Sequence, residues 1–224
     1  MRLYQGDYNR EVQFSDDPLD VALKWQSMGA PRIHVVDLDG AANGELGNRD
    51  IIRNIAQVLL VPSQLGGGLR DLATIKEVLQ MGIERVILGT VAVEEPELVR
   101  EACRKFSEYI IVSIDARDGK VATHGWQKET GWATLAFAEH LMGLGVRRFI
   151  YTDIVRDGTL TEPNFAAISE LIHAVRAPVI AAGGISSVLH LKMLKQLGAE
   201  GAIVGKALYT KDIDLKEALA AMQT

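Results

Sequence analysis

The sequence repeats itself at a spacing of 116 residues. Gly67, Gly68 and Leu69 recur as Gly183, Gly184 and Ile185. The same spacing relates four further pairs, which are Gly29 and Gly145, Asp37 and Asp153, Gly82 and Gly198, and Gly89 and Gly205. Because all these pairs share one unbroken spacing, the two halves are copies of one unit. Two such copies predict a closed barrel with approximate two-fold internal symmetry.

Short β-branched segments alternate with amphipathic segments along both halves. The expected strands are residues 33–37, 59–65, 85–88, 109–115, 147–152, 178–181 and 201–204, and the expected helices are residues 18–28, 48–58, 72–81, 95–106, 132–144, 164–175, 188–197 and 215–222. Strands that alternate with helices pair in parallel through right-handed crossovers. No linker interrupts the pattern, so we expect residues 1–224 to form one (βα)8 TIM-barrel domain rather than an open doubly wound sheet.

The repeat also predicts that one strand is absent. The expected strand 109–115 ends at Asp115, and the same spacing counted back from Asp115 falls before Met1. We therefore expect an N-terminally truncated barrel that lacks its first strand and keeps only seven. Its two exposed edges, residues 33–37 and 201–204, would lack a neighbour. Since unpaired edges attract other chains, we expect self-association through them.

Composition excludes several classes of partner. The chain has 24 Lys and Arg against 29 Asp and Glu, a net charge of −5, which offers no basic surface for nucleic acid or an anionic membrane. It contains neither an apolar segment of roughly 18 residues nor a signal-peptide core, so we expect a cytoplasmic protein.

The single cysteine, Cys103, lies in a helical pattern and is expected to be a structural thiol. The five histidines are scattered, and we expect neither a metal nor a cofactor.

The glycine pairs predict phosphate binding. Each pair follows an apolar strand and precedes a helix, where backbone amides can approach an oxyanion closely. A further glycine follows the next strand in each half, as consecutive βα loops of barrels provide. The repeat therefore predicts two phosphate sites that face each other across one mouth, built on Gly67, Gly68 and Gly89 and on Gly183, Gly184 and Gly205. The alternative is that these glycines only form tight turns.

Asp115 is the candidate catalytic residue. It ends an apolar strand, which places its carboxylate at the C-terminal rim, where a raised pKa would make it a general acid. The alternative is a solvated loop aspartate. Thr152 ends the next strand and could orient a reacting hydroxyl. Residues 116–127 contain an Asp-Gly pair, which is typical of a tight β-hairpin turn. We expect Trp126 on the returning arm of this hairpin, where it either stacks on a planar heterocycle or packs within the loop. Asp37 and Asp39 form a carboxylate pair, but no His, Cys, Asp or Glu residues accompany it at a spacing typical of metal ligands.

The chain resembles the ProFAR isomerase family of histidine biosynthesis, the phosphoribosylformimino-aminoimidazole carboxamide ribotide isomerases. The resemblance covers the whole chain, in the segments RLYQGDY, HVVDLDGA, GGGLRD, LGTVAVE, VSIDARDGKVATHGWQ, YTDIVRDGTL, AAGGISS and VGKALY. It implies an Amadori rearrangement of a substrate with a phosphate at each end. By position it implies Asp115 as general acid, Thr152 as an orienting group, Trp126 beside the imidazole and Arg2 reaching towards substrate. The implied phosphate ligands are Gly67, Gly68, Gly89 and Thr90, and Gly183, Gly184, Gly205 and Lys206.

The chain departs from the family at its start. Family members open with a strand similar to I-P-A-I-D, whose aspartate is the general base, and this residue is absent here. A positioned acid or base contributes about 10²–10⁴-fold, so we expect an impaired enzyme. Other possibilities are a non-catalytic barrel remnant that binds phosphate and the cyclase subunit of imidazole glycerol phosphate synthase, although that family has lysine in the loop of Arg2. The related isomerases that act on two substrates have arginine where this chain has His124, and this difference favours an enzyme with one substrate.

Overall fold

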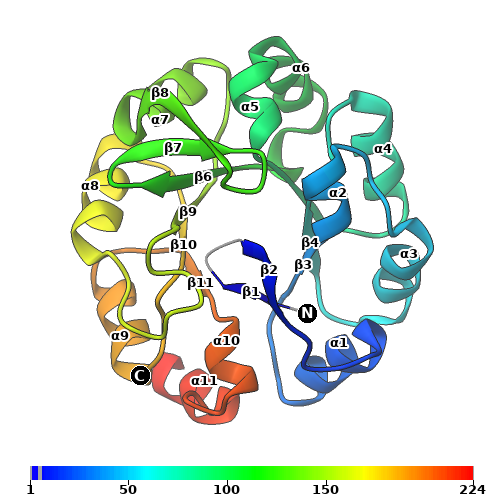
Figure 1. Cartoon of the computed structure of the whole chain (residues 1–224), viewed down its shortest axis with the longest axis vertical. Coiled ribbons are helices and arrows are strands. Elements are labelled where there is room, and N and C mark those ends of the chain that lie inside the picture. Colours follow the sequence, from blue (N-terminus) through cyan, green and yellow to red (C-terminus); the bar gives the residue numbers. More distant parts are fainter. Residues whose placement is uncertain (1, 5–6, 224) are drawn as a thin grey trace.

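Seven parallel strands surrounded by helices form the body of the protein. The computed structural model describes residues 2–4 and 7–223, with side chains from residue 12 onwards. Figure 1 shows the strands as an inner ring and the long helices as an outer ring. In hydrogen-bonded order, the parallel strands are β11 (Gly201–Ile203), β10 (Val179–Ala182), β9 (Phe149–Asp153), β6 (Ile110–Arg117), β5 (Arg85–Leu88), β4 (Ser63–Gly66) and β3 (Ile33–Val36). This is a nearly closed α/β barrel.

All eight expected long helices are present, with ends within two residues of those expected. They are α1 (Pro18–Ser27), α3 (Arg49–Val58), α4 (Leu72–Gln80), α6 (Pro96–Phe106), α7 (Thr134–Gly143), α8 (Phe165–Val175), α9 (Val188–Gln196) and α11 (Leu215–Gln223). The shorter helices α2 (Leu38–Asn43), α5 (Thr90–Glu94) and α10 (Lys206–Tyr209), and the 3-10 turn η1 (Ser107–Tyr109), were not expected. None of the described helices is long and apolar enough to cross a membrane.

The expected total of seven strands is wrong. Two antiparallel strands, β7 (Lys120–Thr123) and β8 (Lys128–Ala133), extend the sheet to nine strands, and β1 (Arg2–Tyr4) and β2 (Asp7–Val12) form a separate hairpin. The expectation of a missing first strand is not confirmed. β3 and β11 are the two ends of the parallel order, and the described residues contain no pairing between them. Self-association through these edges stays a prediction.

The strand expected at residues 59–65 is also shorter than expected. β4 begins only at Ser63, because Pro62 lacks a backbone donor and the amides of the preceding residues bond elsewhere. Gln26 Oε1 accepts hydrogen bonds from Leu60 N at 2.6 Å and Val61 N at 3.2 Å. The side chain of Leu60 is 91% exposed. The apolar character of this segment therefore reflects a loop held against α1, not a strand.

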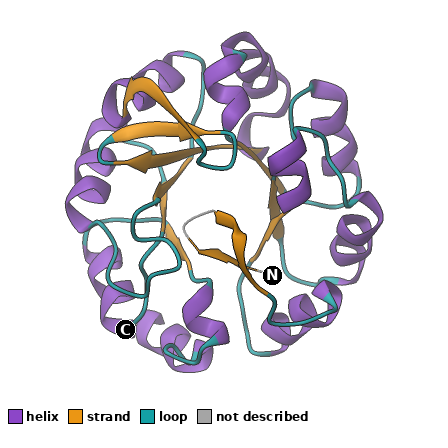
Figure 2. Ribbon diagram, in the orientation of Figure 1, coloured by secondary structure: helices purple, strands orange, loops and turns teal. Residues whose placement is uncertain are grey.

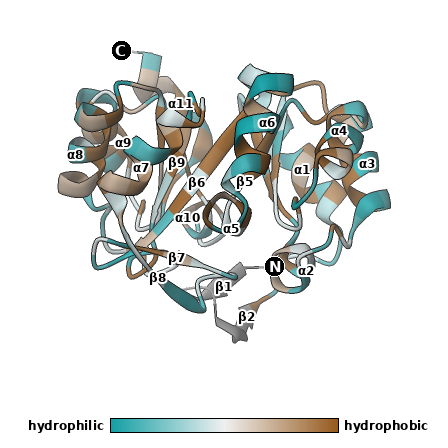
Figure 3. Cartoon of the chain, turned by 90° about the horizontal axis from the view of Figure 1, so that it is seen from above, coloured by the Kyte–Doolittle hydropathy of each residue, from teal (hydrophilic) through white to brown (hydrophobic). Residues whose placement is uncertain are grey.

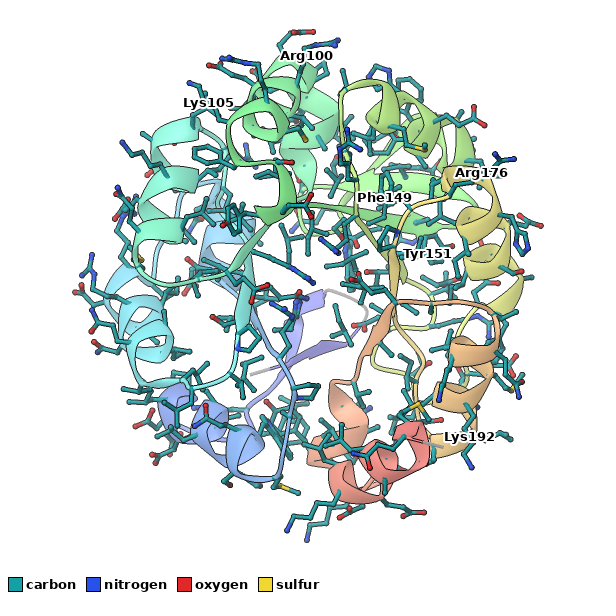
Figure 4. All side chains as sticks on the ribbon, turned by 180° about the vertical axis from the view of Figure 1, so that it is seen from behind. Arg100, Lys105, Phe149, Tyr151, Arg176 and Lys192 are labelled. Atoms are coloured by element: carbon teal, nitrogen blue, oxygen red, sulfur yellow. The ribbon has the colours of Figure 1, made fainter. Side chains whose placement is uncertain are left out.

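Two apolar layers stabilise the barrel. The larger one lies between the sheet and the helices, and Figure 4 shows Phe149 and Tyr151 of β9 inside it, with Arg100, Lys105, Arg176 and Lys192 on the outer surface. The smaller one fills the barrel interior with the side chains of Ile87, Ile111, Ile150, Ile180 and Ala182. Figure 3 shows the apolar strands between helices whose outer faces are more hydrophilic. This two-layer core is what alternating strands and helices predict.

The repeat extends to side-chain contacts. Asn48 Nδ2 donates to Asp37 Oδ1 at 2.7 Å, and 116 residues later Asn164 Nδ2 donates to Asp153 Oδ2 at 2.8 Å. Both aspartates lie at the C-terminal ends of equivalent strands, β3 and β9, and both are buried. Each asparagine therefore ties the start of the following long helix to the end of its own strand.

Asp37 is a structural residue. Burial opposes its ionisation and acts to raise its pKa, but the hydrogen bond from the Asn48 side chain and those from the amides of Gly40, Asn48 and Gly47 outweigh this, so the pKa is lowered. A carboxylate with a lowered folded pKa stabilises the fold above its unfolded pKa of about 3.9, and this stabilisation is lost as the pH falls through the folded pKa.

We expect Asn48→Ala to reduce the free energy of unfolding at pH 7 by about 1–3 kcal/mol, because a buried carboxylate loses a donor. The loss should shrink as the pH falls through the folded pKa of Asp37, because a protonated carboxyl gains less from the donor that Asn48 provides. Urea unfolding at pH 7 and pH 3.5 measures both effects. Asn54→Ala, on the exposed face of α3, is the matched control. An unchanged loss at both pH values would contradict the role of Asp37.

Cys103 is buried in α6, as expected for a structural thiol. Burial raises its pKa to about 11, so little thiolate exists near neutral pH. We expect the native protein to react with a thiol reagent such as dithionitrobenzoate at pH 8 far more slowly than the unfolded protein, with one equivalent released on denaturation. Rapid reaction in the native state would contradict this burial.

Candidate active site

A cavity of about 350 Å³ opens at the C-terminal ends of the parallel strands. Residues from β3 to β6 and from β9 to β11 line it, together with the turns that follow. Figure 2 shows the β7–β8 hairpin and the β1–β2 hairpin over this end of the ring, and Figure 3 shows the β7–β8 hairpin on the side opposite the C-terminus. Barrel enzymes hold their reactive groups at this end.

Asp115 projects into the cavity from β6, and both of its carboxylate oxygens are hydrogen-bonded. Ser113 Oγ donates to Oδ1 at 2.6 Å, and Trp126 Nε1 donates to Oδ2 at 2.9 Å. β6 continues to Arg117, so Asp115 lies within the strand and not in a solvated loop. Thr152 is its pairing partner on β9 and lines the same cavity. The structure therefore brings the two predicted catalytic residues together.

Trp126 covers the cavity from a turn, not from the returning arm of a hairpin as expected. The Asp-Gly hairpin itself is confirmed: Asp118 and Gly119 connect β6 to β7 with φ of 50° and 77°, the signs that a type I′ turn requires. The chain then turns again before β8, and Trp126 has a φ of 72° in this second turn. The earlier expectation failed because β7 ends at Thr123 and so places Trp126 beyond the first hairpin.

His124 anchors this second turn to α5. Its backbone N donates to Thr90 Oγ1 at 2.8 Å, and its Nε2 lies 3.2 Å from Glu94 Oε1. The residue that the resemblance implies as a phosphate ligand, Thr90, thus also holds the loop that carries Trp126. These contacts connect α5, on one side of the cavity, to the turn that carries Trp126.

The glycines of the first half line the cavity as predicted. Gly67, Gly68 and Gly89 lie there beside Thr90. Gly67 and Gly68 also have a structural reason to be glycine. A Cβ on Gly67 would overlap with the carbonyl oxygen of Asp37, and one on Gly68 would lie 2.6 Å from the backbone of Glu45. Both have positive φ, so the tight-turn interpretation and the ligand-binding interpretation apply to the same residues.

The second set of glycines lies outside this cavity. Gly183 and Gly184 repeat the backbone packing of their counterparts, with a Cβ on Gly183 lying 2.8 Å from the carbonyl oxygen of Asp153. Gly205 lines a different cavity, and Lys206 Nζ donates to the carbonyl oxygen of Gly158 at 2.8 Å. The structure therefore brings only the first set next to Asp115. Arg2 has its backbone in β1, and its side chain lies outside the described residues.

Asp157 and Arg70 are two cavity residues that were not predicted from the sequence. Both line the cavity, Asp157 from the loop after β9 and Arg70 from the turn after the first glycine pair. The signal was available, because Arg70 directly follows Gly-Gly-Leu and Asp157 follows Thr152 on the same rim. A guanidinium beside glycine amides is a common phosphate ligand, and a second carboxylate offers a second site for proton exchange. Within the described residues, no group of three or more His, Cys, Asp or Glu side chains could hold a metal ion.

Comparison with known proteins gives one consistent result. Residues 1–214 match the family described as "Histidine biosynthesis protein". A protein from Dehalococcoides mccartyi is 60% identical over 97% of this chain and 92% of its own length, and it is named 1-(5-phosphoribosyl)-5-((5-phosphoribosylamino)methylideneamino) imidazole-4-carboxamide isomerase. Proteins from Roseiflexus sp. (strain RS-1), 50% identical over 100% of this chain and 94% of their own length, and from Microcystis aeruginosa, 51% identical over 99% and 89%, carry the same name. With this identity over nearly its whole length, the chain belongs to the ProFAR isomerase family of histidine biosynthesis.

Proposed function

We propose that the protein catalyses the isomerisation for which its relatives are named. It would convert the aminoaldose of a bis-phosphorylated imidazole carboxamide ribonucleotide to the aminoketose in histidine biosynthesis. The observation that supports this most directly is Asp115, a carboxylate fixed by two hydrogen bonds in a cavity at the C-terminal end of the barrel. The family membership indicates the reaction, and Asp115 in the cavity is a candidate catalytic group for it.

The chemistry needs two proton transfers. A proton must reach the ring oxygen of the ribose so that the ring opens, and a proton must leave C2 so that the double bond can move towards the ketose. We assign the first transfer to Asp115, with Thr152 orienting Asp115 or the ribose hydroxyls. Asp157 is the second carboxylate that lines the cavity, and we propose it as the group that exchanges the other proton.

The phosphates would bind the two glycine sets. Gly67, Gly68, Gly89 and Thr90 offer backbone amides and a hydroxyl on one side, with Arg70 adding charge. We propose the equivalent residues Gly183, Gly184, Gly205 and Lys206 for the second phosphate, on the strength of the repeat. Arg2 would reach the substrate from the N-terminal hairpin. No metal or cofactor enters this proposal.

The family assigns proton abstraction to an aspartate of a first strand, and the described residues place no strand between β3 and β11. If Asp157 does not replace that aspartate, turnover would be reduced by about 10²–10⁴-fold. Because this general base is not among the described residues, a second candidate function is binding of the bis-phosphate without conversion. Isothermal titration with substrate together with a turnover assay distinguishes the two, because both functions bind and only one converts.

We expect Asp115→Asn to lower kcat by about 10²–10⁴-fold, because the amide cannot donate the proton. Substrate binding should change little, since the amide keeps the shape of the side chain. Asp118→Asn is the matched control, an exposed aspartate at the tip of the same hairpin whose positive φ asparagine tolerates. Activity of Asp115→Asn within twofold of the parent protein would contradict the assignment of Asp115 as the acid.

Trp126 tests the position of the imidazole. We expect Trp126→Ala to raise KM about 5- to 150-fold, since stacking of a base on an aromatic side chain contributes about 1–3 kcal/mol. Trp126→Phe keeps an aromatic face but loses the indole donor, so its KM should stay much closer to that of the parent. Steady-state kinetics of both variants measures the difference. Equal KM values for the two variants would show that Trp126 does not stack on substrate.

A further inference from the structure

Glu94, the last residue of α5, contacts two different parts of the cavity wall. Its Oε1 is 3.2 Å from His124 Nε2, and its Oε2 is 3.9 Å from Arg70 Nη1. Arg70 and Trp126 line the cavity, whereas Glu94 and His124 lie behind it. Figure 3 shows α2, α5 and β7 at the same end of the barrel. One carboxylate outside the cavity thus contacts both a cation of its wall and the turn that carries Trp126.

The turn that carries Trp126 needs contacts to hold its conformation. His124, Gly125 and Trp126 have φ of 56°, 60° and 72°, so three consecutive residues lie in the left-handed region. Glycine enters this region readily, but residues with larger side chains stay there only where surrounding contacts hold them. The backbone N of His124 donates to Thr90 Oγ1, and the His124 ring contacts Glu94. Both contacts come from α5, which makes this helix a support of the turn.

The contact between Glu94 and His124 defines which ring nitrogen donates. A carboxylate can only accept hydrogen bonds, so His124 Nε2 is the donor. His124 Nδ1 lies 3.1 Å from Thr123 Oγ1, a hydroxyl that can either donate or accept. Both nitrogens of the ring therefore have a partner whether the ring is neutral or charged.

Arg70 has a second contact at the end of α2. A Cβ on Gly44 would lie 2.8 Å from Arg70 Cζ, so the guanidinium packs directly on this glycine. Gly44 caps α2 with a φ of 83°, a conformation that also favours glycine. The guanidinium therefore contacts the ends of both α2 and α5, and these two contacts limit the positions that it can take beside the cavity.

The internal repeat distinguishes this arrangement from the general architecture. Counted forward by 116 residues, Arg70 corresponds to Ser186 and Glu94 to Thr210. The second half thus has neither charge, although its glycine turn and its Asp–Asn pair match those of the first half. Contacts that fold the repeated unit occur in both halves, whereas the Arg70–Glu94 pair belongs to the half whose glycines line the cavity. The pair is therefore a feature of the site and not of the repeated unit.

We propose that Glu94 is a positioning residue, which holds Arg70 and the turn of Trp126 in one arrangement around the cavity. A phosphate of the substrate would then meet a guanidinium that is already in place, which lowers the cost of binding. Trp126 Nε1 would keep its hydrogen bond to Asp115 Oδ2, which is 2.9 Å long. This inference rests on the proposed function, because that function assigns Arg70 to phosphate binding and Asp115 to proton transfer. Glu94 acts through these residues and not on the substrate.

Two substitutions of Glu94 separate its two contacts. Glu94→Gln keeps an oxygen that accepts from His124 but loses the charge that faces Arg70, so we expect KM to rise about 2- to 5-fold with little change in kcat. Glu94→Ala loses both contacts, so we expect kcat to fall as well, by about 2- to 10-fold. Glu95→Gln removes the same charge from the adjacent exposed residue and is the matched control. Steady-state kinetics in which Glu94→Gln and Glu95→Gln behave alike would overturn the proposal.

A double-mutant cycle tests the contact between Glu94 and Arg70. Arg70→Gln should raise KM, and the addition of Glu94→Gln should raise KM no further, because the carboxylate has already lost its partner. Effects of the two substitutions that multiply would show that they act independently, and this would overturn the role of Glu94 in placing Arg70.

Fluorine NMR tests the turn without substrate. The protein has three tryptophans, so labelling with 5-fluorotryptophan gives three resonances, and Trp126→Phe identifies the one from Trp126. We expect Glu94→Ala to shift or broaden this resonance and to leave those of Trp25 and Trp132 in place, whereas Glu94→Gln should leave all three in place. An unchanged Trp126 resonance in Glu94→Ala, or equal changes in all three resonances, would overturn the proposal.

The same measurements distinguish a failure of this inference from a failure of the proposed function. A parent protein without turnover would contradict the isomerisation alone. The Kd of the bis-phosphorylated substrate from isothermal titration would then replace KM, with the same order of effects among the variants, and the NMR experiment would stand as described. A parent protein with full turnover whose Glu94 variants match Glu95→Gln would contradict the role of Glu94 alone.

Discussion

The close packing of each glycine turn on the preceding loop is the constraint on which the rim of the barrel depends. Gly67 lies against the carbonyl of Asp37, and Gly183 lies against that of Asp153, at distances that leave no room for a Cβ. The loops that must accept this contact are themselves held, since Asn48 and Asn164 bind the two aspartates. The rim of the barrel is therefore built from close contacts between backbone segments. This steric demand applies at both positions, which is why glycine is required twice.

The two halves of the chain show what a shared sequence unit does in different surroundings. Their glycine turns and Asp–Asn pairs agree, because these contacts are local and lie within one unit. Burial of the strands differs, because it depends on what lies on the other side: Thr152 is covered and Val36 is not, although both occupy the same place in their unit. Contacts within one unit thus follow from the repeated sequence, whereas the burial of a strand edge depends on the element that lies next to it.

Much of the fold and part of the site could be predicted from the sequence. The 116-residue repeat and the period of the apolar residues identified the parallel strands and the long helices, because both depend on local pattern. They failed where tertiary contacts decide the outcome. Gln26 holds the amides of Leu60 and Val61 out of the sheet, and no periodicity reveals a side chain 34 residues away. Asp157 and Arg70 were missed for a related reason, since loops carry no period and only the cavity shows which loop residues face it.

The bond between Trp126 and Asp115 connects the cover of the cavity to its chemistry. Trp126 Nε1 donates to Asp115 Oδ2, so one oxygen of the carboxylate is bound to the residue that covers the cavity. A change in the position of the indole would therefore also change the hydrogen bonding of Asp115. The turn that carries Trp126 is fastened by His124 to Thr90 and Glu94, on the side of the cavity where we place a phosphate. In the proposed complex a phosphate at Gly89 and Thr90 would lie beside this anchor, so the proposed phosphate site, the turn and Asp115 form one connected set of contacts.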